Sequence, residues 1–248
     1  MRTQAEIENI PFLTLRLKAL PDADNAAVGR IMKNFLPTEF PSGFFSGGNM
    51  KDKLTRKQKN RRIAESALMI ALSTVLSVLP VVNLPFGGSV TLFSQVPVIL
   101  VSYRYGVKWG IKTGLVFAAI QMIAGFENFS YVSGIASYTI LILADYVVAF
   151  SVLGTGGMFK NKLKNQAVCL ALGSAVVTSV RFLCHFISGV TIWKAYAGDL
   201  PVWRYSLVYN GSFMLPELLI TVLGVVIISS VFDLRSETIK TKRNNAKK

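Results

Sequence analysis

Six long apolar segments constrain this chain more than any other feature of its sequence. They cover roughly residues 64–82, 92–104, 107–125, 135–158, 166–192 and 205–232. About 20 residues of helix cross the hydrocarbon core of a membrane, where only helices or closed barrels satisfy their own backbone. These runs are too continuous for the alternating pattern of barrel strands. The sequence therefore predicts an all-α membrane protein with six transmembrane helices, of which the second is short.

The charged residues, only 16% of the chain, gather at alternate ends of these segments. Nineteen Lys and Arg residues lie in the basic run of residues 51–62, around two of the loops and in the tail. The other three loops, 83–91, 126–134 and 194–204, hold only Lys194 and Arg204. Because Lys and Arg are retained on the cytoplasmic side of a membrane, both termini are predicted to be cytoplasmic.

Outside the six-helix membrane domain, residues 64–232, the chain is polar. Residues 50–63 are predicted to form a basic cytoplasmic segment, and residues 233–248 a basic cytoplasmic tail. Residues 1–49 have no net charge and no long apolar run, and are predicted to be an unstructured extension. The net charge of +14 favours attraction to anionic membrane lipid. It does not indicate nucleic-acid binding, since no folded basic domain carries it.

Asp145 stands within the apolar fourth segment, where an ionisable side chain marks a functional site by default. It either pairs with Arg181 or stays protonated, or it serves as the counter-ion of a cationic ligand, which we favour. His185 is the only histidine of the chain. It shares a helix face with Arg181 and Gly189, each four residues away. Gly189 leaves room for a ligand or for another helix.

The outer ends of the last two segments are rich in aromatic and polar residues. Trp193 is expected either to anchor the chain at the membrane interface or to stack on a ligand. Tyr205 and Asn210 open the sixth segment. Glu217 follows Asn210 by seven residues, on the same face, as a second ligand group or a structural partner. The turn Pro85–Ser89 is a candidate lid, and the whole set suits a flat, positively charged organic ligand.

Other kinds of site find little support in the sequence. No Walker A motif is present, so the chain has no nucleotide site of its own for powering transport. With one histidine and two isolated cysteines, Cys169 and Cys184, a metal site is not expected. Ser133 lacks the earlier glycine of an intramembrane serine protease motif. We therefore expect no enzymatic activity, no cofactor and no metal.

Ala67 and Ala71 form a small-xxx-small pattern on the first segment, which typically serves helix packing.

Residues 60–232 resemble the thiamine-specific substrate-binding subunit, or S component, of energy-coupling-factor vitamin transporters. Four patches of sequence carry the resemblance, the last of them in two stretches. They are Ala64–Leu72; Leu84–Leu92 with Pro97 and Arg104–Gly106; Asp145–Phe150; and His185–Trp193 with Tyr205–Glu217.

The resemblance implies a six-helix subunit of the bacterial cell membrane that binds thiamine from outside. It further implies docking on a transmembrane coupling subunit that two cytosolic ATPase subunits power. Ala67 and Ala71 match the motif through which such subunits contact the coupling subunit. The positions that match ligand contacts or their neighbours are Asp145, Tyr146, His185, Gly189, Trp193, Tyr205 and Asn210.

The chain also departs from the pattern of this family. Some relatives carry Glu at the position of Asp145, and Leu92 stands where some have a second acid. A tryptophan of the first outer loop is missing. The resemblance therefore implies lid contacts that differ from those of its relatives.

Two alternatives stay open. The chain could serve as the S component for another vitamin, with hydroxymethylpyrimidine and riboflavin as the main rivals. It could also be a stand-alone proton-coupled carrier that uses Asp145 or Glu217 as its proton site.

The extension itself resembles a translated leader. The run Ser46-Gly-Gly-Asn-Met50 is what a ribosome-binding GGAGG and a start codon give when translated. The run Pro21–Gly29 resembles the translation of a conserved stretch of the thiamine-pyrophosphate riboswitch. We therefore expect Met50 to be the natural start, which N-terminal sequencing of natively expressed protein would test.

Overall fold

The computed structural model of the protein describes residues 54–235, together with the backbone of residues 240 and 241. The expectations for residues 1–49, including the translated leader, lie outside the described residues. So do those for residues 50–53 and for most of the tail.

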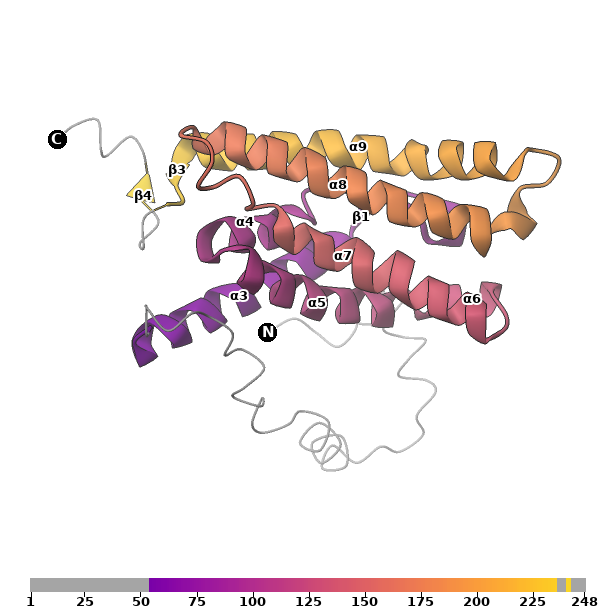
Figure 1. Ribbon diagram of the computed structural model, residues 1–248, viewed down its shortest axis with the longest axis horizontal. Coiled ribbons are helices and arrows are strands. Elements are labelled where there is room, and N and C mark those ends of the chain that lie inside the picture. Colours follow the sequence, from indigo (N-terminus) through magenta and orange to yellow (C-terminus); the bar gives the residue numbers. More distant parts are fainter. Residues whose placement is uncertain (1–53, 236–239, 242–248) are drawn as a thin grey trace, which may run out of the picture. The chain divides into compact units, whose positions relative to one another are not determined.

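Helices make up most of the described chain (Figure 1). They are α3 (Arg56–Ser77), α4 (Val96–Tyr105), α5 (Val107–Ala124), α6 (Ile135–Ile140), α7 (Ala149–Ser151), α8 (Gln166–Thr191) and α9 (Val202–Val231). A π-helical segment, Leu141–Val148, joins α6 to α7, and a 3-10 turn, Val152–Thr155, extends α7. Further 3-10 turns lie at Pro85–Gly87, Phe126–Tyr131 and Lys194–Tyr196. The strands are β1 (Pro80–Asn83), β2 (Ser89–Thr91), β3 (Phe232–Asp233) and β4 (Lys240–Thr241).

The first helix lies earlier in the chain than the apolar pattern predicts. Thr55 and Gln58 form a capping box, in which each side chain binds the backbone N–H of the other residue. This cap satisfies free N–H groups at the helix start, so α3 begins at Arg56 rather than near residue 64. The helix ends at Ser77, three residues before Pro80, which cannot continue it.

The loop that the sequence predicts as the first outer loop is part of a β-hairpin. Strand β1 pairs antiparallel with β2, and Pro80, Val82 and Asn83 lie opposite Thr91, Val90 and Ser89. Residues 80–82, which the apolar pattern assigned to the first helix, therefore belong to this hairpin. Its tip is the turn Pro85–Gly87.

Four helical stretches of the described chain are long and apolar enough to cross a membrane. They are α5, residues 135–155, α8 and α9. The short α4 has 10 residues, and α3 opens with the basic run. By length and hydropathy, neither is therefore counted among the four. The mostly helical prediction is confirmed, whereas the prediction of six crossings stays a prediction.

Helices α8 and α9 lie side by side along most of their length (Figure 1). Helix α4 contacts both α5 and α9. Glycines allow the closest approach between α5 and residues 152–155, because a Cβ atom on Gly110 would overlap the backbone oxygen of Gly154. Small residues at such contacts are typical of helices that pack in a membrane.

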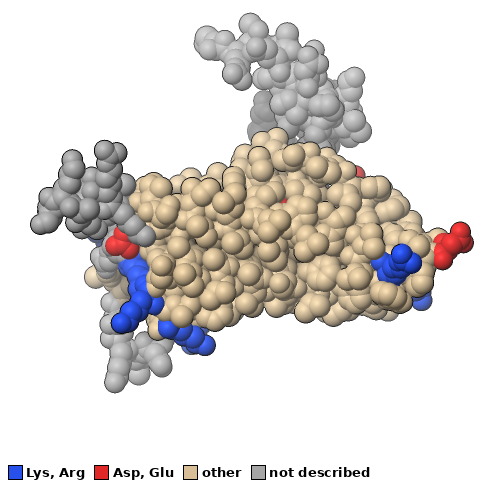
Figure 2. All heavy atoms as spheres, turned by 90° about the horizontal axis from the view of Figure 1, so that it is seen from above, with Lys and Arg blue, Asp and Glu red and all other residues tan. Residues whose placement is uncertain are grey.

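The outer surface of the helices is apolar between two charged ends. Leu68, Leu215 and Leu219 are each at least 64% exposed. Figure 2 shows one face on which Lys, Arg, Asp and Glu gather at the two ends, with very few between them. We call the end that holds Arg104, Lys160 and the start of α3 the basic end. The end that holds the hairpin tip is the hairpin end.

Candidate ligand-binding site

The site is built around Asp145, which lies in the π-helical segment Leu141–Val148. A π-helix pairs each backbone N–H with the carbonyl five residues earlier, and such segments occur frequently at functional sites. The side chain of Asp145 is 13% exposed. A carboxylate this deep in an apolar bundle requires hydrogen-bond partners.

Three side chains from α8 and the turn after it supply those partners. Nδ1 of His185 lies 2.8 Å from Oδ1 of Asp145. The Ser188 hydroxyl donates to Oδ2 at 2.5 Å, and the Trp193 indole N–H donates to the same oxygen at 3.2 Å. Asp145, His185 and Trp193, singled out from sequence, therefore form one cluster with Ser188.

One ring nitrogen of His185, Nε2, makes no hydrogen bond within the cluster. Nε2 of His185 is buried and has no hydrogen-bond partner among the described residues. The imidazole ring meets Phe213 edge-on, with ring centroids 6.0 Å apart. Because buried polar atoms nearly always find a partner, Nε2 is the atom of the cluster best suited to meet a ligand.

Arg181 is not the partner of Asp145. Its guanidinium lies over the ring of Phe150, 4.4 Å from the centroid. Among the described residues, no ion pair joins Arg181 to Asp145. The side chain that pairs with Asp145 is that of His185. Among residues 54–235, the carboxylate of Asp145 therefore has no ion pair with a lysine or an arginine, although Arg181 is near enough to interact with it electrostatically.

An aromatic cluster covers Asp145 at the hairpin end. Phe86 packs on Tyr196 with centroids 4.4 Å apart, and it lies 5.5 Å from Tyr131. The Trp193 ring lies 6.2 Å from both Phe86 and Tyr131. All three loops of this end contribute to the cluster, and Trp193 joins it to the carboxylate. We call Phe86, Tyr131, Trp193 and Tyr196 the aromatic lid.

Tyr146 is buried, and its hydroxyl binds a neighbouring loop rather than Asp145. It donates to the Gly125 carbonyl at 2.9 Å and accepts from the Asn128 amide at 3.0 Å. These bonds fix the turn that follows α5. Tyr146 thus holds the surroundings of the site through a neighbouring loop.

Gly189 and Asn210 lie where α8 and α9 meet. A Cβ atom on Gly189 would overlap the Ser206 hydroxyl and press on the Asn210 amide. The Asn210 amide donates to the His185 carbonyl at 3.2 Å and to the Ser206 carbonyl at 2.9 Å. Of the two alternatives for Gly189, the structure supports the close approach of another helix.

Tyr205 reaches the hairpin only through its neighbour. Its ring stacks on Tyr209, with centroids 5.8 Å apart. The Tyr209 hydroxyl donates to the Pro85 carbonyl and accepts from the Gly88 N–H at 3.1 Å. Tyr209 therefore connects α9 with the tip of the hairpin.

Glu217 has structural partners and lies in a separate cluster. Its Oε1 accepts from the backbone N–H of Thr91 and, at 2.5 Å, from the Thr91 hydroxyl. Its Oε2 accepts from the Gln95 amide at 2.6 Å. These bonds hold β2 and the start of α4 against α9, so the structural alternative for Glu217 is the one supported.

The alanines of α3 lie on its outer surface. Both Ala67 and Ala71 are exposed, beside the exposed Leu68 and Leu72. They do not pack against another helix of the described chain, as internal packing would require.

No cluster of metal-ligating side chains occurs within residues 54–235.

Several residues of the site were not singled out from the sequence. They are Ser188, Tyr209 and the lid residues Phe86, Tyr131 and Tyr196. The spacing of Ser188, three residues after His185, was a usable signal because it places both on one helix face. The lid residues carry no such signal, since loops distant in sequence bring them together.

Known proteins match this chain over the same region. A family described as thiamine transporter protein (Thia_YuaJ) matches residues 63–235. The thiamine transporter ThiT of Bacillus subtilis is 33% identical over 171 residues, covering 64% of this chain and 85% of that protein. ThiT of Lacticaseibacillus paracasei is 25% identical over 184 residues, covering 68% of this chain and 87% of that protein.

A solved structure of ThiT from Listeria monocytogenes has a similar fold. It superposes with a TM-score of 0.57 at 21% identity, covering 69% of this chain and 94% of that one. At this identity the superposition supports the fold alone. Taken with the matches in sequence, it identifies the chain as a membrane protein that belongs to the thiamine transporter protein family.

Proposed function

We propose that this protein is the thiamine-binding subunit of an energy-coupling-factor importer in the bacterial cell membrane. It captures thiamine from outside and passes it inward through a transmembrane coupling subunit that two cytosolic ATPases power. Six helices cross the membrane, with both termini in the cytoplasm. The gathering of charges at two ends of an apolar surface supports this arrangement (Figure 2).

The cluster at Asp145 carries the proposal. Thiamine is a flat aromatic cation with a hydrogen-bonding aminopyrimidine ring. The Asp145 carboxylate forms no ion pair with a lysine or an arginine of the described chain and can serve as the counter-ion of thiamine. Aromatic faces of the lid can stack on a cationic ring, an interaction that strengthens when water is excluded. Nε2 of His185 supplies a hydrogen bond to the ligand.

The hairpin tip is the part that must move to admit the ligand. Phe86 has a φ of 65°, a strained conformation for a residue that is not glycine, and Gly87 follows with a φ of 90°. Strained backbone of this kind is frequent at ligand clamps. We infer that Phe86 leaves Tyr196 when the site opens and returns when thiamine is bound.

The exposed pair Ala67 and Ala71 supports the coupling step of the proposal. Small residues on an outer helix surface allow a second membrane protein to approach the backbone closely. Substituting both by Leu is expected to abolish ATP-dependent uptake while thiamine binding persists. A stand-alone proton-coupled carrier would instead keep its uptake in that variant and in cells without the ATPase subunits.

Thiamine titration followed by tryptophan fluorescence tests the proposal. The chain has three tryptophans, Trp109, Trp193 and Trp203. The variant Trp109→Phe/Trp203→Phe reports Trp193 alone, and we expect thiamine to quench it at sub-micromolar concentration. Hydroxymethylpyrimidine and riboflavin, titrated in the same way, should bind more weakly. Absence of saturable binding of thiamine would count against the proposal.

A further inference from the structure

Arg181 lies in the middle of α8, and the structure leaves its charge without a bonded acceptor. Its Nε is buried and has no hydrogen-bond partner among residues 54–235. Its guanidinium lies over the ring of Phe150, 4.4 Å from the centroid. None of the ion pairs of the described chain includes it. Because a buried charge normally has a hydrogen-bonded partner, this side chain requires an explanation.

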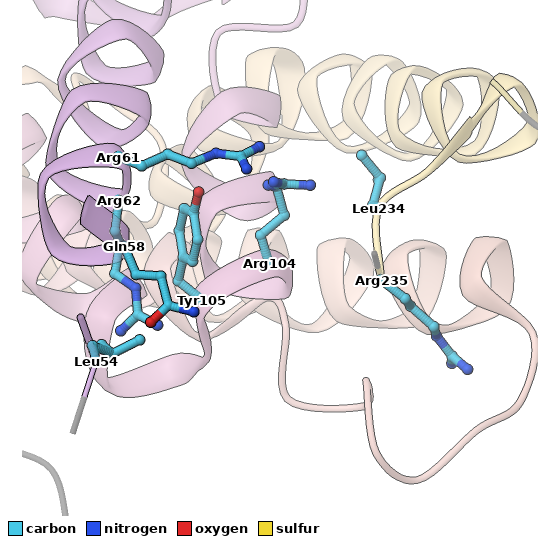
Figure 3. A pocket seen from close by; sticks show the side chains of 8 residues that line it. All are labelled: Leu54, Gln58, Arg61, Arg62, Arg104, Tyr105, Leu234 and Arg235. Carbon is cyan, nitrogen blue, oxygen red and sulfur yellow. The ribbon is translucent and has the colours of Figure 1, made fainter. Parts of the chain in front are cut away.

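Arginines at the basic end are bonded differently. Figure 3 shows the cavity that Arg61 and Arg104 help to line. Each of these two arginines forms an ion pair with Glu65, at 2.7 Å and 3.2 Å. Arg181 has no such pair in the described chain, although it lies within the membrane-length helix α8.

On one side, Arg181 is one helical turn from the cluster around Glu217. Thr178 precedes Arg181 by three residues, which places both on one face of α8. The Thr178 hydroxyl donates to the Gln95 amide oxygen at 3.4 Å. The amide nitrogen of Gln95 in turn donates to Glu217 at 2.6 Å.

On the other side, Arg181 is one turn from the cluster around Asp145. His185 follows Arg181 by four residues, and its Nδ1 lies 2.8 Å from Oδ1 of Asp145. Arg181 is near enough to Asp145 and to Glu217 to interact with both electrostatically. One cation is therefore shared between the acid of the proposed thiamine site and the acid that holds the hairpin.

Glu217 can accept one hydrogen bond more than it receives. A carboxylate offers about four lone-pair positions. The backbone N–H and the hydroxyl of Thr91 use two of them on Oε1, and Gln95 uses one on Oε2. The guanidinium of Arg181 suits the remaining position, because a bond between two charged groups is shorter and stronger than a neutral one. Such a bond would hold Glu217, and through it Thr91 of β2, more firmly.

Asp145 competes with Glu217 for the same guanidinium. A cation that binds at Asp145 neutralises its charge and repels Arg181 at the same time. The attraction between Arg181 and Glu217 is then the one that remains. Since the contact with Phe150 is not a hydrogen bond, Arg181 can leave it without breaking one.

We propose that Arg181 couples the charge at Asp145 to the hold of Glu217 on the hairpin. When a cation binds at Asp145, Arg181 moves to Oε2 of Glu217 and strengthens its contact with Thr91. Arg181 is thus a positioning residue that acts through Glu217 and needs no contact with the ligand. The inference rests on the proposed function for the identity of the cation, and on the arrangement of the two acids for the coupling.

Site-resolved hydrogen exchange of two hairpin amides in the purified full chain tests the coupling. The Thr91 N–H binds Glu217, whereas the Gly88 N–H binds the Tyr209 hydroxyl. We expect saturating thiamine to slow both amides, that of Thr91 by at least about fivefold, the lower end of usual couplings between sites. In Arg181→Met, which replaces the charge by an apolar side chain, Gly88 should still respond to thiamine, whereas Thr91 should lose its response.

A second arm of the experiment needs no ligand. Asp145→Asn removes the charge that competes for Arg181, so the Thr91 amide should exchange more slowly than in the native chain without thiamine. The double variant Asp145→Asn/Arg181→Met should lose this effect. Arg204→Met, which removes a charge from an exposed position of α9, is the matched control for Arg181→Met and should keep the native response to thiamine.

The two arms separate this inference from the proposed function. If thiamine does not bind, the proposed function fails and the arm without ligand decides the coupling. If thiamine binds and slows the Thr91 amide equally in the native chain and in Arg181→Met, the coupling is overturned. Exchange at Thr91 that Asp145→Asn leaves unchanged also overturns it, and this result decides the question where Arg181→Met does not fold.

Discussion

The imidazole Nδ1 of His185 lies 2.8 Å from a carboxylate oxygen of Asp145, and both side chains are 13% exposed. This contact joins the π-helical segment to α8 across the bundle. The same carboxylate also receives hydrogen bonds from Ser188 and Trp193. The proposed ligand site and the packing of two helices therefore share one acid.

Asp145→Asn is expected to weaken thiamine binding by at least about tenfold, equivalent to ~1.4 kcal/mol. The substitution keeps the size of the side chain and removes the charge that we propose as the counter-ion of thiamine. Isothermal titration of the purified protein measures the change. Asp199→Asn, in an exposed loop at the same end, is the matched control and should bind normally. An unchanged affinity for Asp145→Asn would remove Asp145 from the site.

Ser188→Ala is expected to weaken thiamine binding by about tenfold, since a hydrogen bond to a charged group contributes roughly 1.5–3 kcal/mol. The hydroxyl holds Oδ2 of Asp145 at 2.5 Å and so fixes the direction of the carboxylate. Fluorescence titration provides the measurement. Ser179→Ala, on an exposed position of α8, should not change the affinity. Equal affinities in both variants would contradict the positioning role.

Gly189→Ala is expected to lower the free energy of unfolding by about 1–3 kcal/mol, the usual cost of overpacking. The added methyl group would overlap the Ser206 hydroxyl at the contact of α8 with α9. Thermal unfolding in detergent measures the loss. Gly211→Ala is the control, because a Cβ atom there meets nothing within 4 Å. It should leave stability unchanged or raise it, since Ala favours helix over Gly.

Glu217→Gln is expected to loosen the hairpin and lower the midpoint of thermal unfolding, at a cost of roughly 1–3 kcal/mol. The carboxylate accepts from the Thr91 backbone and hydroxyl and from Gln95, and an amide cannot accept all of these bonds. Hydrogen exchange of the Thr91 amide should become faster. Glu127→Gln, exposed at the same end, should leave that rate unchanged. If hydrogen exchange of the Thr91 amide stays slow in Glu217→Gln, Glu217 does not hold β2 against α9.

Much of the helical fold could be predicted from the continuity of the apolar runs. Helix α8, Gln166–Thr191, departs from its predicted range by a single residue. The start of α3 was placed late because apolar character marks where a helix enters lipid, whereas capping decides where it begins. Thr55 and Gln58, three residues apart, were a readable signal for that start. The hairpin was missed because Val81 and Val82 continue the apolar run.

The candidate site was predictable in part, for a physical reason. Asp145 and His185 stand out because ionisable groups in apolar helices need a partner, and the structure makes each the partner of the other. The helix spacing that links His185 to Ser188 was also available. The meeting of Phe86 with Tyr196 was not, because it depends on how two distant loops close over the bundle.

The π-helical segment Leu141–Val148 has a consequence for how the membrane-length stretch of residues 135–155 evolves. Bonding across five residues fits more residues into a turn than the α-helix on either side does. The apolar positions before residue 141 and after residue 148 therefore follow two separate phases. A relative that lacks the additional residue would align with a gap here, and a different side chain would then face His185.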